Sequence, residues 1–140
     1  MKLRFAIVAA LLLASSALAS AQDKKSCYST NAFEKEVGYC AAVRIGNTLY
    51  ISGAAAGGEM PGAINSVYGE LKKILAAHGL SMANVVKENV YATDLDAFIK
   101  HKALRKAMYG DSFPAATWVQ VARLYSPALV LEVEAVAVFP

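Results

Sequence analysis

Apolar side chains recur with a helical period in one long segment of the chain. Between residues 63 and 78 they fall at Ile64, Val67, Tyr68, Leu71, Ile74 and Leu75. Steps of three and four residues put these side chains on one face of an α-helix. Gly79 follows directly, and glycine commonly ends helices. The pattern predicts an amphipathic helix over Ala63–His78.

Two segments of extended character flank this helix. Val43–Ser52 holds two apolar stretches around Gly46-Asn47, a dipeptide that accepts the left-handed backbone of a tight turn. Val85–Thr93 is rich in β-branched residues, which favour strands. We expect a hairpin in the first segment and a single strand in the second.

A second helix is predicted directly after this strand. Asp94 or Asp96 can cap its first turn, because a carboxylate accepts hydrogen bonds from the free backbone N–H groups there. We expect this helix to run to about Tyr109 and to end at Gly110.

Two alternating segments close the chain. Thr117–Arg123 and Leu129–Val138 alternate apolar and polar residues, and the proline of Tyr125-Ser126-Pro127 interrupts strand pairing between them. They predict a second hairpin. Strands, helix, strand, helix and strands in this order indicate an α+β domain, with the two helices packed on one face of a mixed sheet.

The N-terminal residues follow a different pattern, that of an export signal. Lys2 and Arg4 precede a short apolar run, and small residues follow it. The run is shorter than the roughly 20 residues that span a bilayer. We expect a signal peptide over residues 1–21, cleaved after Ala21 or alternatively after Ala19. The mature protein would then be periplasmic or secreted, with no membrane attachment.

Removal of this leader changes the charge of the protein. The full chain has 14 Lys and Arg against 11 Asp and Glu, a net charge of +3. The leader holds two of the basic residues, so the single domain expected over residues 22–140 carries about +1. Nucleic-acid binding needs clustered cations, and the remaining short runs, such as Lys72-Lys73, are typical of solvated helix faces. We expect no nucleic-acid partner.

The only two cysteines, Cys27 and Cys40, both lie in the domain that would be exported. An oxidising compartment permits a disulfide between them. That bridge would close a loop of about 14 residues and contribute roughly 3 kcal/mol in the chain-entropy model. The alternative is two free thiols, with Cys40 half-buried beside a pocket.

Several common site chemistries are not predicted. His78 and His101 lack metal-ligand spacing with each other and with the cysteines, so we expect no metal site. Gly53–Gly62 is glycine-rich, but no Gly-Lys-Ser/Thr follows it, so it predicts a flexible loop and no phosphate-binding loop. No motif places a histidine to activate Ser52 as a nucleophile.

Five motifs spread over the domain resemble those of one protein family. They are Gly38–Val43, Gly46–Gly53, Val85–Leu95, Phe113-Pro114-Ala115 and Leu131–Val138. Together they make the chain similar to the RidA/YjgF reactive-intermediate deaminases over nearly all of its length after the leader. The resemblance implies a chorismate-mutase-like fold and a homotrimer with small-molecule clefts between subunits. It also implies hydrolysis of an imine or enamine to a ketoacid and ammonia without metal or organic cofactor.

Three positions keep the residues that this resemblance associates with the site. Tyr39 matches the tyrosine of the pocket, Ser52 the serine at the end of a strand, and Glu132 the acid associated with water activation. We therefore expect Glu132 and Ser52 in catalytic roles and Tyr39 in substrate binding, because a carboxyl group can orient water and move protons.

Three other positions depart from the pattern that the resemblance implies. Ala116 stands where an arginine would grip a substrate carboxylate, Lys102 replaces an asparagine on a helix, and Trp118 replaces a small residue. Arginine suits that role because its planar fork makes two charge-assisted bonds to a carboxylate. Lys102 or Arg123 could supply the missing charge. Trp118 would fill the pocket or offer a flat apolar wall, which favours an apolar or aromatic ligand.

Three functions are open on this sequence. The first is an exported protein of this kind that binds a small metabolite in clefts between subunits and has diverged from imine deamination. The second is a deaminase of the 2-iminobutanoate/2-iminopropanoate type in which Lys102 replaces the arginine. The third is a non-catalytic interaction or chaperone-like module whose pocket is blocked by Trp118.

Overall fold

A computed structural model describes residues 24–140, so the predicted signal peptide over residues 1–21 lies outside the described residues. The strands are β1 (Ser26–Tyr28), β2 (Ala42–Ile45), β3 (Thr48–Gly57), β4 (Val85–Ala92), β5 (Ala115–Gln120) and β6 (Leu129–Val138). The helices are α2 (Ala32–Glu36), α3 (Met60–Ala77), α4 (Leu95–Lys100), α5 (Lys102–Tyr109) and the short 3-10 turn η2 (Met82–Asn84).

The six strands form one mixed sheet in the order β1-β2-β3-β6-β4-β5. β4 and β5 are parallel, and the other neighbours are antiparallel. The hairpin predicted around Gly46-Asn47 is confirmed, since Ile45 pairs with Thr48 across a two-residue turn. The strand predicted over Val85–Thr93 is confirmed as β4.

The second predicted hairpin is wrong. β5 ends at Gln120 and is an edge strand beside β4, whereas β6 lies between β3 and β4 and does not pair with β5. The chain between β4 and β5 crosses over through the two helices α4 and α5. β5 therefore runs in the same direction as β4 and pairs beside it at the edge of the sheet. Sequence alternation identified the two strands and could not identify their neighbours.

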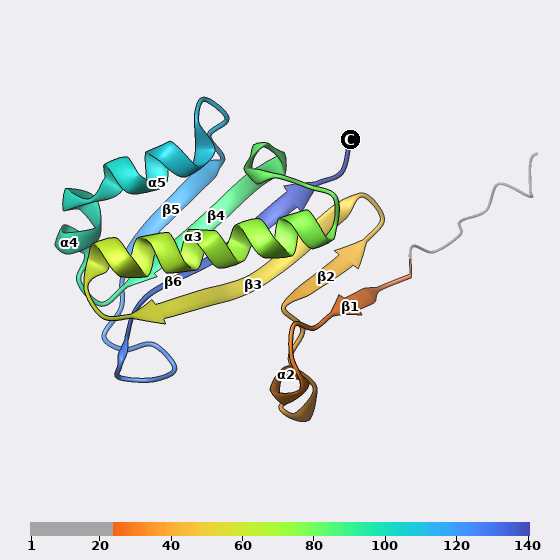
Figure 1. The fold of residues 1–140 in the computed structure, drawn as a ribbon, viewed down its shortest axis with the longest axis horizontal. Helices are drawn as coiled ribbons and strands as arrows, with labels where there is room; N and C mark the ends of the chain where they lie inside the picture. The colour runs from red at the N-terminus through yellow and green to blue at the C-terminus, as the bar shows by residue number, and fades with distance from the viewer. Residues whose placement is uncertain (1–23) are drawn as a thin grey trace, which may run out of the picture.

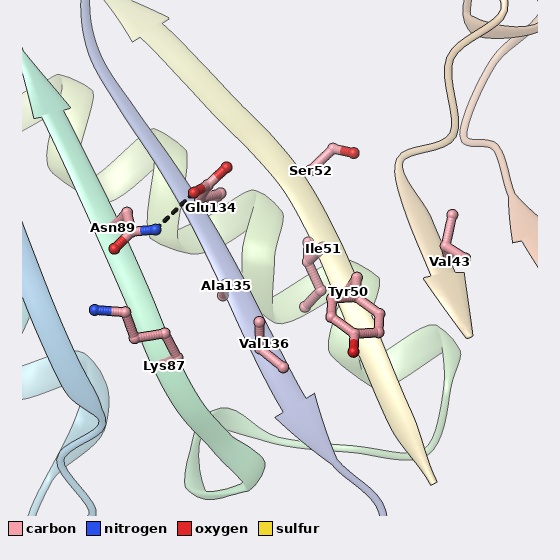
Figure 2. Close-up of a pocket in the computed structure, with 9 residues that line it drawn as sticks. All are labelled: Val43, Tyr50, Ile51, Ser52, Lys87, Asn89, Glu134, Ala135 and Val136. Carbon is pink, nitrogen blue, oxygen red and sulfur yellow. Dashed lines mark hydrogen bonds between the residues drawn. The ribbon is translucent and has the colours of Figure 1, made fainter. Parts of the chain in front are cut away.

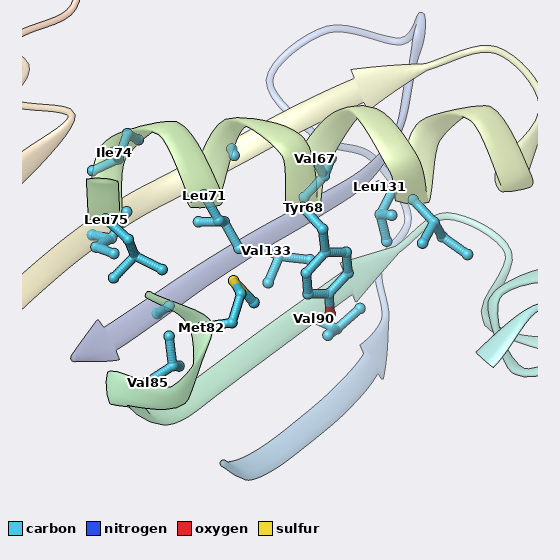
Figure 3. Packing of buried hydrophobic residues seen from close by; sticks show 14 of the residues in the cluster. Val67, Tyr68, Leu71, Ile74, Leu75, Met82, Val85, Val90, Leu131 and Val133 are labelled. Carbon is cyan, nitrogen blue, oxygen red and sulfur yellow. The ribbon is translucent and has the colours of Figure 1, made fainter. Parts of the chain in front are cut away.

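Three helices, α3, α4 and α5, cover one face of the sheet (Figure 1). α3 buries one apolar face against β3 and β6, including the fully buried Tyr68 and Leu71. Figure 3 shows this layer, in which Leu71 and Tyr68 point from α3 toward Val133 and Val90. β6 alternates along its length, and Leu131, Val133, Ala135 and Ala137 are its core-facing residues. The predicted α+β fold with helices on one face is confirmed.

The boundaries of two helices differ from those predicted. α3 begins at Met60 with Pro61 in its first turn, and β3 extends to Gly57, so no flexible loop spans Gly53–Gly62. Proline is well tolerated in a first helical turn, where its missing N–H has no partner to lose. The predicted helix up to Tyr109 is two helices, α4 and α5, which meet at His101.

The predicted helix caps agree with the structure in three places, one of which is Gly110, the residue that ends α5. Asp94 caps α4, since its Oδ1 accepts a 2.8 Å hydrogen bond from the backbone N–H of Ala97. Gly79 follows α3 with a φ of +72°, a left-handed conformation that glycine adopts without steric cost. Among residues 24–140, no helix combines the length and apolar character needed to cross a membrane.

Candidate functional site

Tyr39, Ser52 and Glu132, which the sequence predicted to share a site, lie together near the middle of β3. The Tyr39 hydroxyl donates to the backbone oxygen of Gly53 at 3.3 Å, and the Ser52 hydroxyl donates to the backbone oxygen of Cys40 at 2.8 Å. The register of β3 on β6 shifts between Ile51 and Ala54, so both bonds meet β3 at a bulge. They fix the segment before β2 against this irregular point of the sheet.

Glu132 reaches the same bulge from the neighbouring strand β6, where it pairs with Ala55. A Cβ atom added to Gly53 would overlap Oε1 of Glu132, so the carboxylate occupies the space that a side chain at position 53 would need. Gly53 is therefore required for this placement of the Glu132 carboxylate.

The ionisable groups of this cluster have shifted pKa values. Burial, and to a smaller extent the charge of Glu134, raises the pKa of the Glu132 carboxyl. Burial also raises the pKa of Tyr39, against the opposite effect of the neighbouring Ser52 hydroxyl. A carboxyl group whose pKa is moved toward neutrality is better matched to general acid–base work at physiological pH.

A hollow of about 440 Å³ opens beside this cluster, and we call it the Glu132 pocket. Its lining is mostly apolar and consists of Phe33, Glu34, Val37, Tyr39, Gly53, Ala55, Tyr125, Leu129 and Glu132. A volume of this size lies within the range of small-molecule sites. The sequence identified Tyr39 and Glu132, but offered no reason to connect them with Phe33 or Tyr125.

The other three predicted site residues lie elsewhere in the chain. Lys102 is exposed at the start of α5, and Ala116 and Trp118 lie on β5. β4 separates β5 from Glu132 on β6. Trp118 is in register with the buried Val90, so its side chain lies on the helix-covered face of the sheet. Glu132 lies between the buried Leu131 and Val133 on β6, so its side chain lies on the opposite face. One chain therefore does not bring the two groups of residues together.

Trp118 packs into the helix layer of its own chain. Its ring meets Phe98 edge to face at a centroid distance of 5.1 Å, and its indole N–H donates to Oε1 of Glu88 at 3.3 Å. The side chain is only half-buried, so part of the ring stays accessible. Within one chain the indole lies away from Tyr39 and Glu132 and does not fill the Glu132 pocket.

The partner of Trp118, Glu88, is a buried carboxylate that the sequence analysis missed. Glu88 is 0% exposed and accepts four hydrogen bonds, from Tyr68 Oη (2.9 Å), Tyr109 Oη (2.6 Å), Arg105 Nε (2.5 Å) and Trp118 Nε1 (3.3 Å). Burial and the charge of Glu88 raise the pKa of both tyrosines. The available signal was the position of Glu88 in step with Val90 and Ala92, which predicts an inward-facing side chain.

This cluster lies beside the position where the resemblance implies an arginine, because Ala116 pairs with Glu88 across β4 and β5. Arg105 is the nearest arginine on α5, but it forms a buried ion pair with Glu88. Arg123 donates from Nε and Nη2 to the backbone oxygens of Leu124 and Tyr125 in its own loop. Lys102 has no ion pair among residues 24–140, so its charge is available near β5. Lys87 on β4 has no ion pair there either, but its Nζ donates a 2.8 Å hydrogen bond to Oγ1 of Thr117 on β5.

A second hollow, of about 260 Å³, lies on the open face of the sheet (Figure 2). Lys87, Asn89 and Glu134 lie along one side of it, and Ser52 and Tyr50 lie along β3. Asn89 and Tyr91 donate hydrogen bonds of 2.6 Å and 3.0 Å to Oε1 of Glu134. Glu134 is thus held by neighbours on β4, and Ser52 lies between this hollow and the Glu132 pocket.

Cys27 and Cys40 form a disulfide in the structure, with a Cα–Cα distance of 5.5 Å. Cys40 also accepts the hydrogen bond from Ser52 through its backbone oxygen, so the bridge lies next to the candidate site. No group of three or more His, Cys, Asp or Glu side chains within the described part of the chain is arranged to hold a metal ion.

Comparison with known proteins gives one consistent family. Residues 29–139 match the family model described as Endoribonuclease L-PSP. A RutC family protein of Pyrococcus horikoshii is 32% identical over 124 residues, which cover 81% of this chain and 97% of the relative. A 2-iminobutanoate/2-iminopropanoate deaminase of Dermatophagoides farinae is 29% identical over 71% of this chain and 84% of its own.

Solved structures agree with the fold. A Mycobacterium tuberculosis protein, described as a member of the YjgF/YER057c/UK114 family, superimposes with a TM-score of 0.76 at 27% identity, covering 83% of this chain and 100% of its own. Yeast Mmf1 gives a TM-score of 0.74 at 26% identity, covering 84% of this chain and 100% of its own. The similarity spans most of the described chain.

Proposed function

Because the chain belongs to the Endoribonuclease L-PSP family, also called RidA/YjgF, we propose that it is an exported homotrimer that binds a small metabolite in clefts between its subunits. In this proposal Tyr39, Ser52 and Glu132 of one subunit face Lys102, Ala116 and Trp118 of the next. Neither a metal nor an organic cofactor takes part.

The placement of Glu132 carries this proposal. Its carboxylate lies in the space left by Gly53, beside Tyr39 and next to an apolar pocket. Burial raises its pKa, which suits a group that exchanges protons with a bound ligand. Because the β5 residues lie beyond β4 in the same chain, a site that uses both groups requires a second copy.

The same geometry supports divergence from ordinary imine deamination. No guanidinium of the described chain is available at β5, since Ala116 replaces the arginine, Arg105 is paired with Glu88 and Arg123 is bonded within its loop. Losing one charged hydrogen bond costs about 1.5 to 3 kcal/mol, or roughly one to two orders of magnitude in capture of a short imino acid. We expect 2-iminobutanoate to be turned over correspondingly more slowly than by an arginine-bearing relative.

A second candidate is retained deaminase activity with Lys102 holding the substrate carboxylate. Two observations favour it: Tyr39, Ser52 and Glu132 lie together at the β3 bulge, and a relative is named a 2-iminobutanoate/2-iminopropanoate deaminase. In that reaction water adds to the imine carbon, Glu132 relays its proton, and the C–N bond breaks to release ketoacid and ammonia.

One assay separates the two candidates. We would measure ammonia and 2-oxobutanoate released from freshly generated 2-iminobutanoate, using residues 22–140, Ala116→Arg, Lys102→Ala and the Dermatophagoides farinae relative. Silence in the wild type with activity in Ala116→Arg supports a diverged binding site. Turnover near that of the relative, lost in Lys102→Ala, supports the deaminase. Turnover near that of the relative that survives Lys102→Ala contradicts both roles.

A further inference from the structure

A segment closed by a disulfide forms one wall of the Glu132 pocket. Cys27 and Cys40 are 13 residues apart in sequence and are joined by the disulfide. The segment between them contains α2 and contributes Phe33, Val37 and Tyr39 to the pocket. A short cross-linked loop has few conformations available, so these three side chains are held near fixed positions.

Local hydrogen bonds order this segment further. Glu34 accepts bonds from the backbone N–H of Thr30 (2.6 Å) and from Nδ2 of Asn31 (3.0 Å), and Asn31 Oδ1 accepts from the backbone N–H of Glu34 (3.1 Å). At the other end, the backbone N–H of Tyr39 donates to the backbone oxygen of Glu34 at 2.7 Å. Glu34 therefore holds both ends of α2 together, and its carboxylate is already hydrogen-bonded within this segment.

The apolar side chains of α2 and of its C-cap residue Val37 are not buried in the core. Phe33 is 60% exposed and Val37 is 57% exposed, and α2 has no buried residue. Both side chains line the pocket, and Tyr125, which is 85% exposed, and Leu129 line it too. Ordered apolar side chains left open to solvent around one hollow are typical of a surface that binds an apolar group.

The charges of the pocket restrict what can enter. Among the described residues that line it, the only ionisable carboxyl groups are Glu34 and Glu132, and there is no Lys, Arg or His. An anionic group would be repelled there, whereas an uncharged apolar group gains from leaving water. Glu132 lies at the boundary between the pocket and the bulge of β3 that Tyr39 contacts, which is where the polar part of a ligand would lie.

We propose that the disulfide-closed segment of residues 27–40 makes the site selective for ligands with a bulky apolar, preferably aromatic, side group. The side group enters the Glu132 pocket between Phe33, Val37 and Tyr125, and the reactive or polar part of the ligand lies at Glu132. This inference rests on the proposed small-molecule site and specifies the class of ligand that it takes.

Binding of two uncharged amides by the disulfide-bonded protein tests this selectivity. 3-Phenylpropanamide and butanamide share a planar carbon–nitrogen group, differ in apolar bulk and do not depend on Lys102. Isothermal titration calorimetry should give at least about tenfold tighter binding of the phenyl compound, since about 1.4 kcal/mol of apolar burial is enough for that factor. Phe33→Ser should abolish most of the preference.

Two further variants make the outcome specific. Ile45→Ser removes an apolar side chain that is 41% exposed but does not line the pocket, and it should keep the full preference. Cys27→Ser with Cys40→Ser should reduce the preference as Phe33→Ser does, with the circular dichroism spectrum of the sheet unchanged. Equal affinity for both amides in the wild type, or a preference unaffected by Phe33→Ser, overturns this inference but leaves the proposed small-molecule site standing. Failure of both amides to bind overturns the inference and the proposed site together.

Discussion

Gly53 decides where the Glu132 carboxylate lies. The two residues come from adjacent strands, and the absence of a Cβ at position 53 leaves the space that Oε1 occupies. The neighbouring bonds from Tyr39 to the backbone of Gly53 and from Ser52 to the backbone of Cys40 then surround that carboxylate with fixed groups. A catalytic or binding role for Glu132 thus depends on a residue that has no side chain.

Substitution of Gly53 tests this dependence. Gly53→Ala should lower the free energy of unfolding by about 1 to 3 kcal/mol, because the added methyl group and Oε1 of Glu132 cannot occupy the same space. In a Glu132→Ala background the same substitution should cost at least about 0.5 kcal/mol less. Urea unfolding of the four proteins measures this coupling.

A matched glycine provides the control for that cycle. Gly62 lies in α3, and a Cβ added there would meet nothing within 4 Å. Gly62→Ala should leave stability unchanged or raise it by about 0.4 to 1 kcal/mol, since alanine has less freedom in the unfolded chain. Equal costs of Gly53→Ala with and without the Glu132 side chain would contradict the proposed contact.

The raised pKa of Glu132 predicts how stability depends on pH. The folded state holds the proton more strongly than the unfolded chain, whose glutamate pKa is about 4.3. The stabilisation from this group is therefore complete below that value and is lost as the pH rises through the higher folded pKa. Relative to Glu132→Gln, the wild type should lose stability as the pH rises from about 4 to about 7. Thermal unfolding of both proteins across that range measures the difference, and curves of equal pH dependence would contradict the raised pKa.

At the scale of elements, one carboxylate joins four of them. Glu88 on β4 accepts hydrogen bonds from α3, α5 and β5, so the helix layer and the edge strand meet at a charged centre inside an otherwise apolar core. Such a centre is costly to leave unpaired, because a buried charge that loses its partner keeps its desolvation penalty. It fixes Trp118 and Arg105, and through them it determines which charges remain at β5.

Removal of Glu88 should therefore be severe. Glu88→Ala leaves the Arg105 guanidinium buried without its ion-pair partner and should lower the free energy of unfolding by about 3 to 5 kcal/mol. Glu70→Ala is the matched control, because Glu70 forms an exposed ion pair with Lys73 at 3.1 Å and should cost about 1 kcal/mol or less. Chemical denaturation of both variants measures the contrast, and similar costs would show that the Glu88 cluster is not a structural centre.

At the scale of the whole molecule, the candidate site is divided. The Tyr39, Ser52 and Glu132 group and the Lys102, Ala116 and Trp118 group lie on different faces of the sheet and on strands separated by β4. A closed ring of identical subunits brings one patch of each copy against a different patch of the next, which is what the proposed trimer requires.

Mixed oligomers test the division. In the proposed site the wild type has Ala116 in place of an arginine, and a double variant with Ala116→Arg and Glu132→Ala lacks the acid. Each alone should therefore hydrolyse 2-iminobutanoate at least about tenfold more slowly than Ala116→Arg. Refolded together in equal amounts, they should recover about a quarter of the activity of Ala116→Arg, because random assembly places the introduced arginine opposite an intact Glu132 in about one cleft in four. Mass spectrometry should confirm mixed trimers. Mixed trimers without activity, where Ala116→Arg alone is active, would contradict a site shared between subunits.

Much of the fold could be predicted from the chain itself. The period of apolar residues predicted α3, the Gly46-Asn47 dipeptide predicted the β2–β3 turn, and the cap at Asp94 predicted the start of α4, because each depends on neighbours a few residues away. The motifs around Tyr39, Ser52 and Glu132 identified the residues of one half of the candidate site.

Strand neighbours, the Glu88 cluster and the Glu132 pocket were decided only by the tertiary structure. β6 lies between β3 and β4, and Phe33 and Tyr125 line one pocket, through contacts between residues roughly 40 to 100 positions apart. Such pairings depend on how separate elements pack together, which local propensity does not encode. The sequence determined the long helix and the main strands and which residues can carry polar chemistry, and packing determined which of those residues meet.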